Sequence, residues 1–173
     1  TKPFLRTSEF LWQEGHTVHM DKEDAEKEVT DILELYKKTV EEELAIPVIT
    51  GKKSEKEKFV GAVYTLTMES LMPDGKALQM GTSHFLGQNF SKPFNLKYAD
   101  KENVERYAWQ TSWGVSWRLI GGMIMVHGDD RGLVLPPRVA PIQVIIIPIY
   151  YSDEDKEKIQ KVSQEIEEKL REV

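Results

Sequence analysis

Cysteine is absent from the 173-residue sequence. Its absence excludes a disulfide framework, a thiolate nucleophile and a zinc site with cysteine ligands, and it suits a reducing compartment. No apolar run is long enough to cross a bilayer, because the longest, at residues 144–149, has the length of a strand and contains Pro148. The sequence also begins without methionine or a signal-peptide pattern, and we interpret it as starting inside a longer protein.

Several motifs of catalysis and nucleotide binding are also missing. There is no Gly-x-Gly-x-x-Gly after a predicted strand, no phosphate-binding P-loop and no Gly-x-Ser-x-Gly elbow. A Ser–His–Asp set cannot be assembled from the sequence alone. These absences disfavour catalysis by a protein nucleophile and leave substrate positioning and charge neutralisation as the chemistry to expect.

The composition is that of a globular chain, with 40% hydrophobic and 30% charged residues. A chain of this length can bury one sizeable core, or one core and the start of a second. The formal charge of −6 argues against a generally basic surface that coats nucleic acid, and it leaves room for a local basic patch.

Residues 79–90, Gln-Met-Gly-Thr-Ser-His-Phe-Leu-Gly-Gln-Asn-Phe, combine six neutral hydrogen-bonding side chains with two glycines and no formal charge. A core strand would be richer in β-branched residues, and a surface loop would carry Lys, Glu or Asp. The segment therefore suggests the wall of a pocket that orients a polar small molecule. A polar strand leading into a turn is the alternative.

Periodicity predicts most of the elements. Helical spacing runs from 21 to 44 and ends before Pro47, and residues 51–58 form a charged surface connection. Alternation predicts an antiparallel pair at 60–72 and 77–85 around Pro-Asp-Gly, with 91–103 as a second excursion across the sheet. A tryptophan-rich segment at 107–117 leads into an apolar helix that ends near 126.

The C-terminal part has a different pattern. Residues 143–149 are nearly all apolar, which predicts a strand buried on both faces. Ser152 and Asp155 form a capping-box pattern that opens a further helix. One strand and one helix cannot make a domain, so we interpret 143–173 as the beginning of a second α/β unit.

Two groups of residues invite a metal hypothesis. His16 and His19 are three apart on an extended segment, which places their rings on opposite faces, and no third ligand is evident. Asp129 and Asp130 lie in a glycine-containing loop, where adjacent acids are usually solvated turn residues. We expect no metal site.

Arg6 and Arg138 are candidates for phosphate contact, because a guanidinium donates two parallel hydrogen bonds. The ordinary alternative for each is a surface ion pair. For Trp12 and Phe59 the ordinary alternative is a place in the core.

Four segments together resemble a known family. They are residues 4–16 (Phe-Leu-Arg-Thr-Ser-Glu-Phe-Leu-Trp-Gln-Glu-Gly-His), 79–90, 110–114 (Gln-Thr-Ser-Trp-Gly) and 127–140 (His-Gly-Asp-Asp-Arg-Gly-Leu-Val-Leu-Pro-Pro-Arg-Val-Ala). In order and spacing they resemble prolyl-tRNA synthetase, a class II aminoacyl-tRNA synthetase, of the archaeal and eukaryotic-like type. The resemblance covers essentially the whole chain.

The resemblance implies an α+β fold in which helices flank an antiparallel sheet and an α/β anticodon-binding domain begins after it. Residues 1–142 would be the C-terminal part of the catalytic domain and 143–173 the start of the anticodon-binding domain. It also implies a reaction in which proline and ATP give prolyl-adenylate, and the prolyl group then moves to tRNA(Pro). Mg2+, a homodimer of the complete protein, a cytoplasmic location and no membrane partner come with the same resemblance.

The resemblance also assigns site residues. ATP contacts fall on Arg6, Glu9, Gln79, Thr82 and Arg138. Proline contacts fall on Trp12, Phe59, His84, Ser112 and Gly114. It assigns no catalytic residue of the protein and no metal ligand.

The chain departs from the family pattern in what it omits. The dimer-forming motif 1, the Arg-x-Glu strand of motif 2 and the Thr-x-Glu loop for the proline amine are missing, and Ala62-Val63 stands where some relatives have Gly-Asp. We therefore expect the isolated chain to be inactive. The alternative hypothesis is a non-catalytic binding module derived from a synthetase, which has lost proline activation.

Overall fold

The computed structural model describes residues 2–172. They fall into two compact units, Thr1–Val139 and Ala140–Val173, which we describe separately. Among the described residues no helix is both long and apolar enough to cross a membrane.

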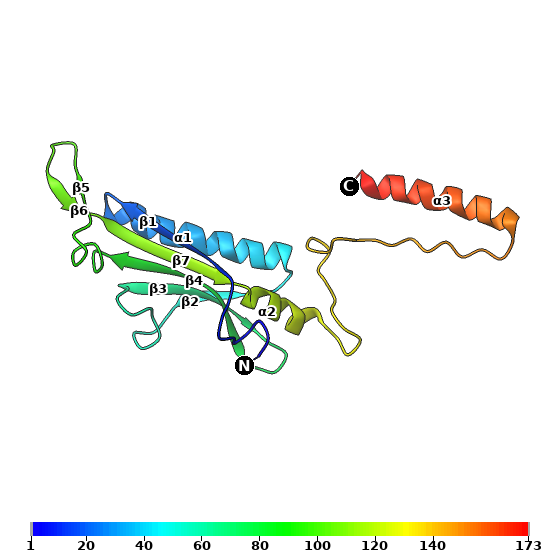
Figure 1. The fold of residues 1–173 in the computed structure, drawn as a ribbon, viewed down its shortest axis with the longest axis horizontal. Helices are drawn as coiled ribbons and strands as arrows, with labels where there is room; N and C mark the ends of the chain where they lie inside the picture. Colours follow the sequence, from blue (N-terminus) through cyan, green and yellow to red (C-terminus); the bar gives the residue numbers. More distant parts are fainter. Residues whose placement is uncertain (1, 173) are drawn as a thin grey trace. The chain divides into compact units, whose positions relative to one another are not determined.

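The first unit is built on a five-stranded antiparallel sheet with the strand order β1-β7-β4-β3-β2 (Figure 1). Every neighbouring pair is antiparallel. The strands are β1 (Trp12–His19), β2 (Ile49–Lys52), β3 (Tyr64–Leu71), β4 (Ala77–Gly87) and β7 (Trp109–Ser116). With the helices that flank it, this sheet confirms the predicted α+β arrangement of an antiparallel sheet flanked by helices.

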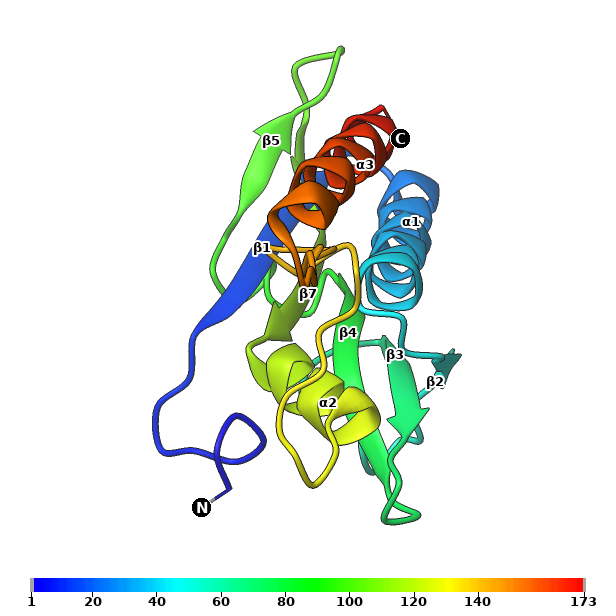
Figure 2. The ribbon, with the colours of Figure 1, turned by 90° about the vertical axis from the view of Figure 1, so that its right-hand side faces the viewer.

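Helix α1 (Lys22–Lys38) covers one face of the sheet, as Figures 1 and 2 show, and packs chiefly on β4 and β7. The side chain of Asp21 caps it by accepting a hydrogen bond from the backbone N–H of Asp24. The helix continues into a π-helical turn, η1 (Thr39–Glu43), so the predicted helix is confirmed with a change of hydrogen bonding near its end. Its inward side chains are fully or largely buried: Ala25, Val29, Leu33, Tyr36 and Val40.

The predicted hairpin is confirmed as β3 and β4. A β-bulge interrupts its register, because Met68 pairs with Gly81 and Glu69 with Gln79, which leaves Met80 without an opposite residue. Met80 is buried in the core with Met68. The short helix α2 (Arg118–His127) follows β7 and contacts β4 and β7, where its Met123 joins the same core.

Two expectations about connecting segments are wrong. Residues 91–103 do not cross the main sheet; β5 (Lys97–Ala99) pairs only with β6 (Glu105–Tyr107) in a separate two-stranded sheet. In the main sheet the strand beside β4 is β7, so β5 and β6 pair only with each other. The charged connection at 51–58 is also shorter than expected, because its first two residues belong to the edge strand β2.

In the second unit the predicted helix is confirmed as α3 (Asp153–Arg171), with the Ser152 side chain accepting a hydrogen bond from the N–H of Asp155. The predicted buried strand at 143–149 is wrong. The segment has no regular secondary structure, and its side chains such as Ile145 and Ile147 are exposed. A strand requires a neighbouring strand for its backbone hydrogen bonds, and no described strand pairs with this segment.

Candidate functional site

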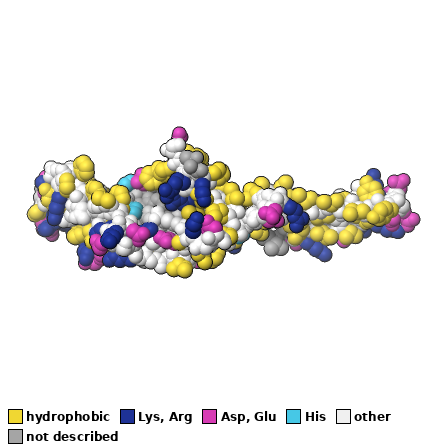
Figure 3. All heavy atoms as spheres, turned by 90° about the horizontal axis from the view of Figure 1, so that it is seen from below, with side chains coloured by type: hydrophobic (Ala, Val, Ile, Leu, Met, Phe, Trp, Pro, Cys, Tyr) yellow, Lys and Arg dark blue, Asp and Glu magenta, His cyan; other side chains and the backbone are white. Residues whose placement is uncertain are grey.

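A cavity of about 600 Å³ opens on the face of the sheet opposite α1. Its lining comes from the N-terminal segment, from β1, β4 and β7, from the connections after β2 and β4, and from the start of α2. On the face shown in Figure 3, histidine side chains reach the surface close to lysine, arginine and apolar side chains. A mixed apolar and polar lining of this size suits a small-molecule ligand.

Strand β4 supplies the polar wall that residues 79–90 predict. Gln79, Thr82 and His84 all line the cavity. Strict alternation would place Gln79 on the opposite face from the other two. The bulge at Met80 changes the alternation, so that Gln79 lines the cavity with Thr82 and His84. Met80 is buried in the core and also touches the cavity.

Strand β7 forms the floor with Ser112 and Gly114, which also line the cavity. A side chain at Gly114 would meet the backbone carbonyl of Gln13 at 3.1 Å and the Trp12 ring at 3.5 Å. The glycine therefore leaves room for the Trp12 ring at the edge of the cavity.

Aromatic side chains form the walls. Trp12 and Phe59 line the cavity and are about half exposed, so neither is the core residue that the ordinary alternative describes. The Phe59 ring lies 5.1 Å from the His84 ring and 6.3 Å from the Phe90 ring. Phe10 meets Trp12 edge to face at 5.7 Å.

Two arginines bring positive charge to the cavity, Arg6 from the N-terminal segment and Arg118 from the first residue of α2. The Nε of Arg118 donates a hydrogen bond to the carbonyl of Leu5, which ties the N-terminal segment to α2. Glu14 is the one carboxylate among the described lining residues, and it lies 3.2 Å from the Nε2 of His16. The cavity thus combines aromatic walls with two guanidinium groups, a suitable arrangement for a ligand with phosphates.

Eight of the ten residues assigned by resemblance line the cavity, and Glu9 and Arg138 do not. Glu9 is exposed. The Nη1 of Arg138 lies 2.9 Å from the Oε1 of Glu43, in an exposed ion pair. The ordinary alternative, a surface ion pair, therefore describes Arg138 in this structure.

His84 is an uncharged side chain at neutral pH. Burial lowers its pKa to about 4, because the charged form loses hydration. Its Nδ1 lies 2.8 Å from the hydroxyl of Thr65, and its Nε2 lies 3.2 Å from the hydroxyl of Thr82. The polar wall therefore presents neutral groups.

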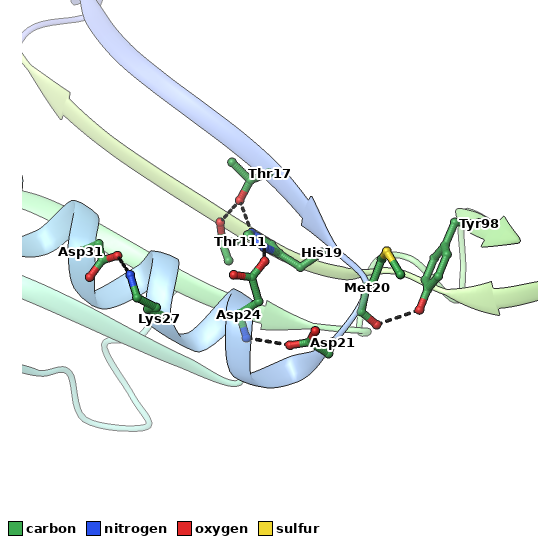
Figure 4. A network of polar contacts seen from close by, with 9 residues as sticks. All are labelled: Thr17, His19, Met20, Asp21, Asp24, Lys27, Asp31, Tyr98 and Thr111. Atoms are coloured by element: carbon green, nitrogen blue, oxygen red, sulfur yellow. Dashed lines mark hydrogen bonds and ion pairs between the residues drawn. The ribbon is translucent and has the colours of Figure 1, made fainter. Parts of the chain in front are cut away.

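Behind the floor, on the α1 face, a polar network fixes β7 (Figure 4). The hydroxyl of Thr111 contacts that of Thr17, which lies 2.8 Å from the Nε2 of His19. The Nδ1 of His19 lies 2.6 Å from a carboxylate oxygen of Asp24 at the start of α1. Thr111 is flanked in sequence by two cavity residues, so this network holds the floor from its reverse side.

Strand β1 places the two candidate histidines on opposite faces of the sheet. His16 lines the cavity, whereas His19 belongs to the network on the α1 face, which confirms the prediction of opposite faces. Asp129 acts as a turn residue, since its carboxylate accepts hydrogen bonds from the N–H groups of Arg131 and Gly132. Residues 2–172 contain no group of three or more His, Asp or Glu placed to hold a metal ion.

Sequence reasoning missed several lining residues, among them Glu14, Gln110 and Arg118. Glu14 could have been found from the two-residue period of β1, because it lies between Trp12 and His16 on one face. No sequence pattern marks Arg118 as a cavity residue, because its position at the cavity depends on how α2 packs against the N-terminal segment.

Comparison with known proteins decides the family. Residues 1–127 match the sequence model of the tRNA synthetase class II core domain (G, H, P, S and T). The chain belongs to the class II tRNA synthetase core family. The resemblance to prolyl-tRNA synthetase is confirmed by its relatives.

Two curated relatives of this synthetase core carry the name proline--tRNA ligase. The protein of Cenarchaeum symbiosum (strain A) is 74% identical over 170 residues, which cover 98% of this chain and 36% of that protein. The protein of Roseiflexus sp. (strain RS-1) is 57% identical over 99% of this chain and 37% of its own length. The chain thus spans little more than a third of these relatives.

A solved structure has the same fold. It is the prolyl-tRNA synthetase from Cryptosporidium parvum, complexed with halofuginone and AMPPNP. It superimposes with a TM-score of 0.87 at 49% identity, over 96% of this chain and 35% of that one.

Proposed function

We propose that this chain is the part of a proline--tRNA ligase that carries one wall of the active site. In the complete protein the carboxylate of proline would attack the α-phosphate of ATP to give prolyl-adenylate and pyrophosphate, and the prolyl group would then pass to tRNA(Pro) with release of AMP. The observation that carries the proposal is the cavity, which gathers eight residues at positions matched by resemblance, in a chain 74% identical to a proline--tRNA ligase. No observation favours the alternative of a non-catalytic module.

The ligand assignments belong to the same proposal. Trp12, Phe59, His84, Ser112 and Gly114 would surround the proline side. Arg6, Gln79 and Thr82 would contact ATP. Glu9 and Arg138 do not line the cavity, and their assignment to ATP rests on the resemblance alone. A site that aligns an attack on the α-phosphate needs positioning and charge stabilisation rather than a protein nucleophile, and the lining residues offer these groups.

Mg2+ would accompany ATP, since it binds through one or two carboxylates together with substrate phosphates. Glu14, the one carboxylate among the described lining residues, would take part. When bound, the ion would supply charge neutralisation at the phosphates.

The domain assignment is also a proposal: 1–142 as catalytic domain and 143–173 as the start of the anticodon-binding domain. It is supported by the end of the family match at residue 127 and of the first compact unit at Val139. The homodimer and the cytoplasmic location rest on the resemblance. Analytical ultracentrifugation of the complete gene product tests the dimer.

The decisive experiment is proline-dependent exchange of pyrophosphate into ATP, followed by prolylation of tRNA(Pro), with the complete gene product. Exchange with proline and its absence without an amino acid are expected. A complete gene product that binds ATP without proline-dependent exchange would support the binding module instead. The 173-residue chain, assayed in parallel, should be inactive.

Variants test the assigned residues in the complete gene product. Trp12→Ala should raise the KM for proline about tenfold or more, since it removes an aromatic wall. An unchanged KM would remove Trp12 from the proline pocket.

Arg138→Ala should slow adenylate formation in single turnovers, whereas Glu43→Ala, which breaks the same ion pair, should not. Equal effects of the two changes would give Arg138 a structural role only.

A further inference from the structure

Thr65 does not line the cavity, yet it contacts two elements of it. It lies on β3 directly opposite His84 of β4, and its side chain is only 1% exposed. The backbone N–H of Phe59 donates a hydrogen bond to its hydroxyl at 3.0 Å, and the Nδ1 of His84 lies 2.8 Å from the same oxygen. Thr65 therefore joins the Phe59 loop to the polar wall.

The hydrogen-bond inventory decides the direction of these contacts. A threonine hydroxyl has one proton to donate. In the described structure the Thr65 oxygen has only two partners, and Phe59 is a donor, so the one available acceptor for the buried proton is the Nδ1 of His84. The opposite arrangement, with a proton on Nδ1, would leave the Thr65 proton buried without an acceptor, which is costly.

The rest of the chain of hydrogen bonds follows. With Nδ1 as an acceptor, a neutral His84 carries its proton on Nε2. That N–H donates to the Thr82 hydroxyl at 3.2 Å, which is on the same face of β4 two residues away. The Thr82 hydroxyl makes no other hydrogen bond within residues 2–172, so its own proton is free to be donated into the cavity. Burial keeps His84 neutral, since its pKa is lowered to about 4.

We propose that Thr65 is a positioning residue that fixes the Nε2–H tautomer of His84 and thereby makes Thr82 a hydrogen-bond donor to the ligand. The ligand group at Thr82 is then an acceptor, such as an oxygen of the nucleotide. This proposal rests on the proposed function for the identity of the ligand, but the tautomer itself does not depend on it.

The first test measures the tautomer directly. The complete gene product is labelled with ¹⁵N-histidine, and the His84 ring signals are identified by their loss in His84→Gln. A protonated Nε2 and an unprotonated Nδ1 at pH 7.5 are expected. A proton on Nδ1 would overturn the proposal, whatever the enzyme activity.

Variants of β3 supply the second test. Thr65→Val keeps the side-chain shape and removes the hydroxyl, so the His84 spectrum should show a mixture of tautomers, and Thr65→Ser should restore the single one. Thr67→Val is the matched control, because Thr67 is a buried threonine on the same strand whose hydroxyl contacts the carbonyl of Gly81 and not His84. A tautomer change in the control, or none in Thr65→Val, contradicts the proposal.

Kinetics test the connection to Thr82. Thr65→Val should raise the KM for ATP in the exchange reaction about tenfold, the size expected for one lost hydrogen bond, and Thr65→Ser should stay within about twofold of the unaltered protein. In a Thr82→Val background, Thr65→Val should have no further effect, because both changes remove the same donor. Additive effects would show that Thr65 acts elsewhere. Absence of proline-dependent exchange in the unaltered protein would refute the proposed function, but it would not affect the result on the His84 tautomer.

Discussion

Helices α1 and α3 begin in the same way and differ in what surrounds them. Each starts with a side-chain cap, Asp21 or Ser152, and each carries apolar residues at helical spacing. Val29 in α1 is fully buried against the sheet, whereas no residue of α3 is buried. Local signals therefore specify a helix, but burial depends on a neighbouring surface, which strands β4 and β7 supply to α1.

The largest expected difference concerns matched leucines, one in each helix. Leu33→Ala should lower the free energy of unfolding by about 3 kcal/mol, because Leu33 is 4% exposed in the core. Leu170→Ala should change it by less than about 0.5 kcal/mol, because Leu170 is 48% exposed. Urea unfolding of the 173-residue chain measures both. Equal losses would show that the apolar face of α3 is covered in solution.

A glycine pair tests how tightly the first unit is packed. A Cβ at Gly15 would lie within 2.3 Å of three ring carbons of Trp113, the residue opposite on β7. Gly15→Ala should therefore cost about 2 kcal/mol or more. Gly51→Ala, on the edge strand β2 with nothing within 4 Å, should be neutral or slightly stabilising. Similar unfolding midpoints for the two variants would show that the Trp113 ring moves aside to make room for the added methyl group.

Removing the cap of α1 or of α3 tests whether the two units unfold separately. Asp21→Ala should lower the unfolding free energy of the first unit by about 1 kcal/mol. Its unfolding is followed by the fluorescence of the four tryptophans, all of which lie in that unit. Ser152→Ala should reduce helical circular dichroism and leave the fluorescence transition unchanged. A shift of that transition by Ser152→Ala would mean that the two units unfold together.

A pH dependence of stability is predicted for the first unit alone. The pKa of His84 is lowered from 6.5 to about 4 in the folded state, so the unfolded state binds the proton more readily. Stability is therefore fully present above pH 6.5 and falls as the pH drops toward 4, by on the order of 1 kcal/mol at pH 5 after allowance for solvent screening. The second unit has no histidine, so the circular dichroism of α3 should not follow this curve.

This slope should be smaller in His84→Gln than in the unaltered chain. An identical slope would assign the proton uptake to other groups.

The sequence predicts an element correctly where the signal lies in nearby residues. It fails where the structure of a segment depends on pairing with another, distant segment. The period of residues 21–44, the Pro-Asp-Gly turn and the Ser152 cap predicted their elements, because each depends on nearby residues. The segment 143–149 has the composition of a buried strand, yet no described strand pairs with it. The sequence pattern also predicts that residues 91–103 cross the main sheet, whereas β5 and β6 pair only with each other.

The sequence by itself determined the family and the neutral, polar character of residues 79–90, because both are properties of residue order. Only the tertiary structure decided which side chains face the cavity. The bulge at Met80 turns Gln79 toward the cavity, and the packing of α2 brings Arg118 to the site. The hydroxyl of Thr65 contacts His84 on the neighbouring strand. These depend on register and packing between segments far apart in the chain, which local pattern does not encode.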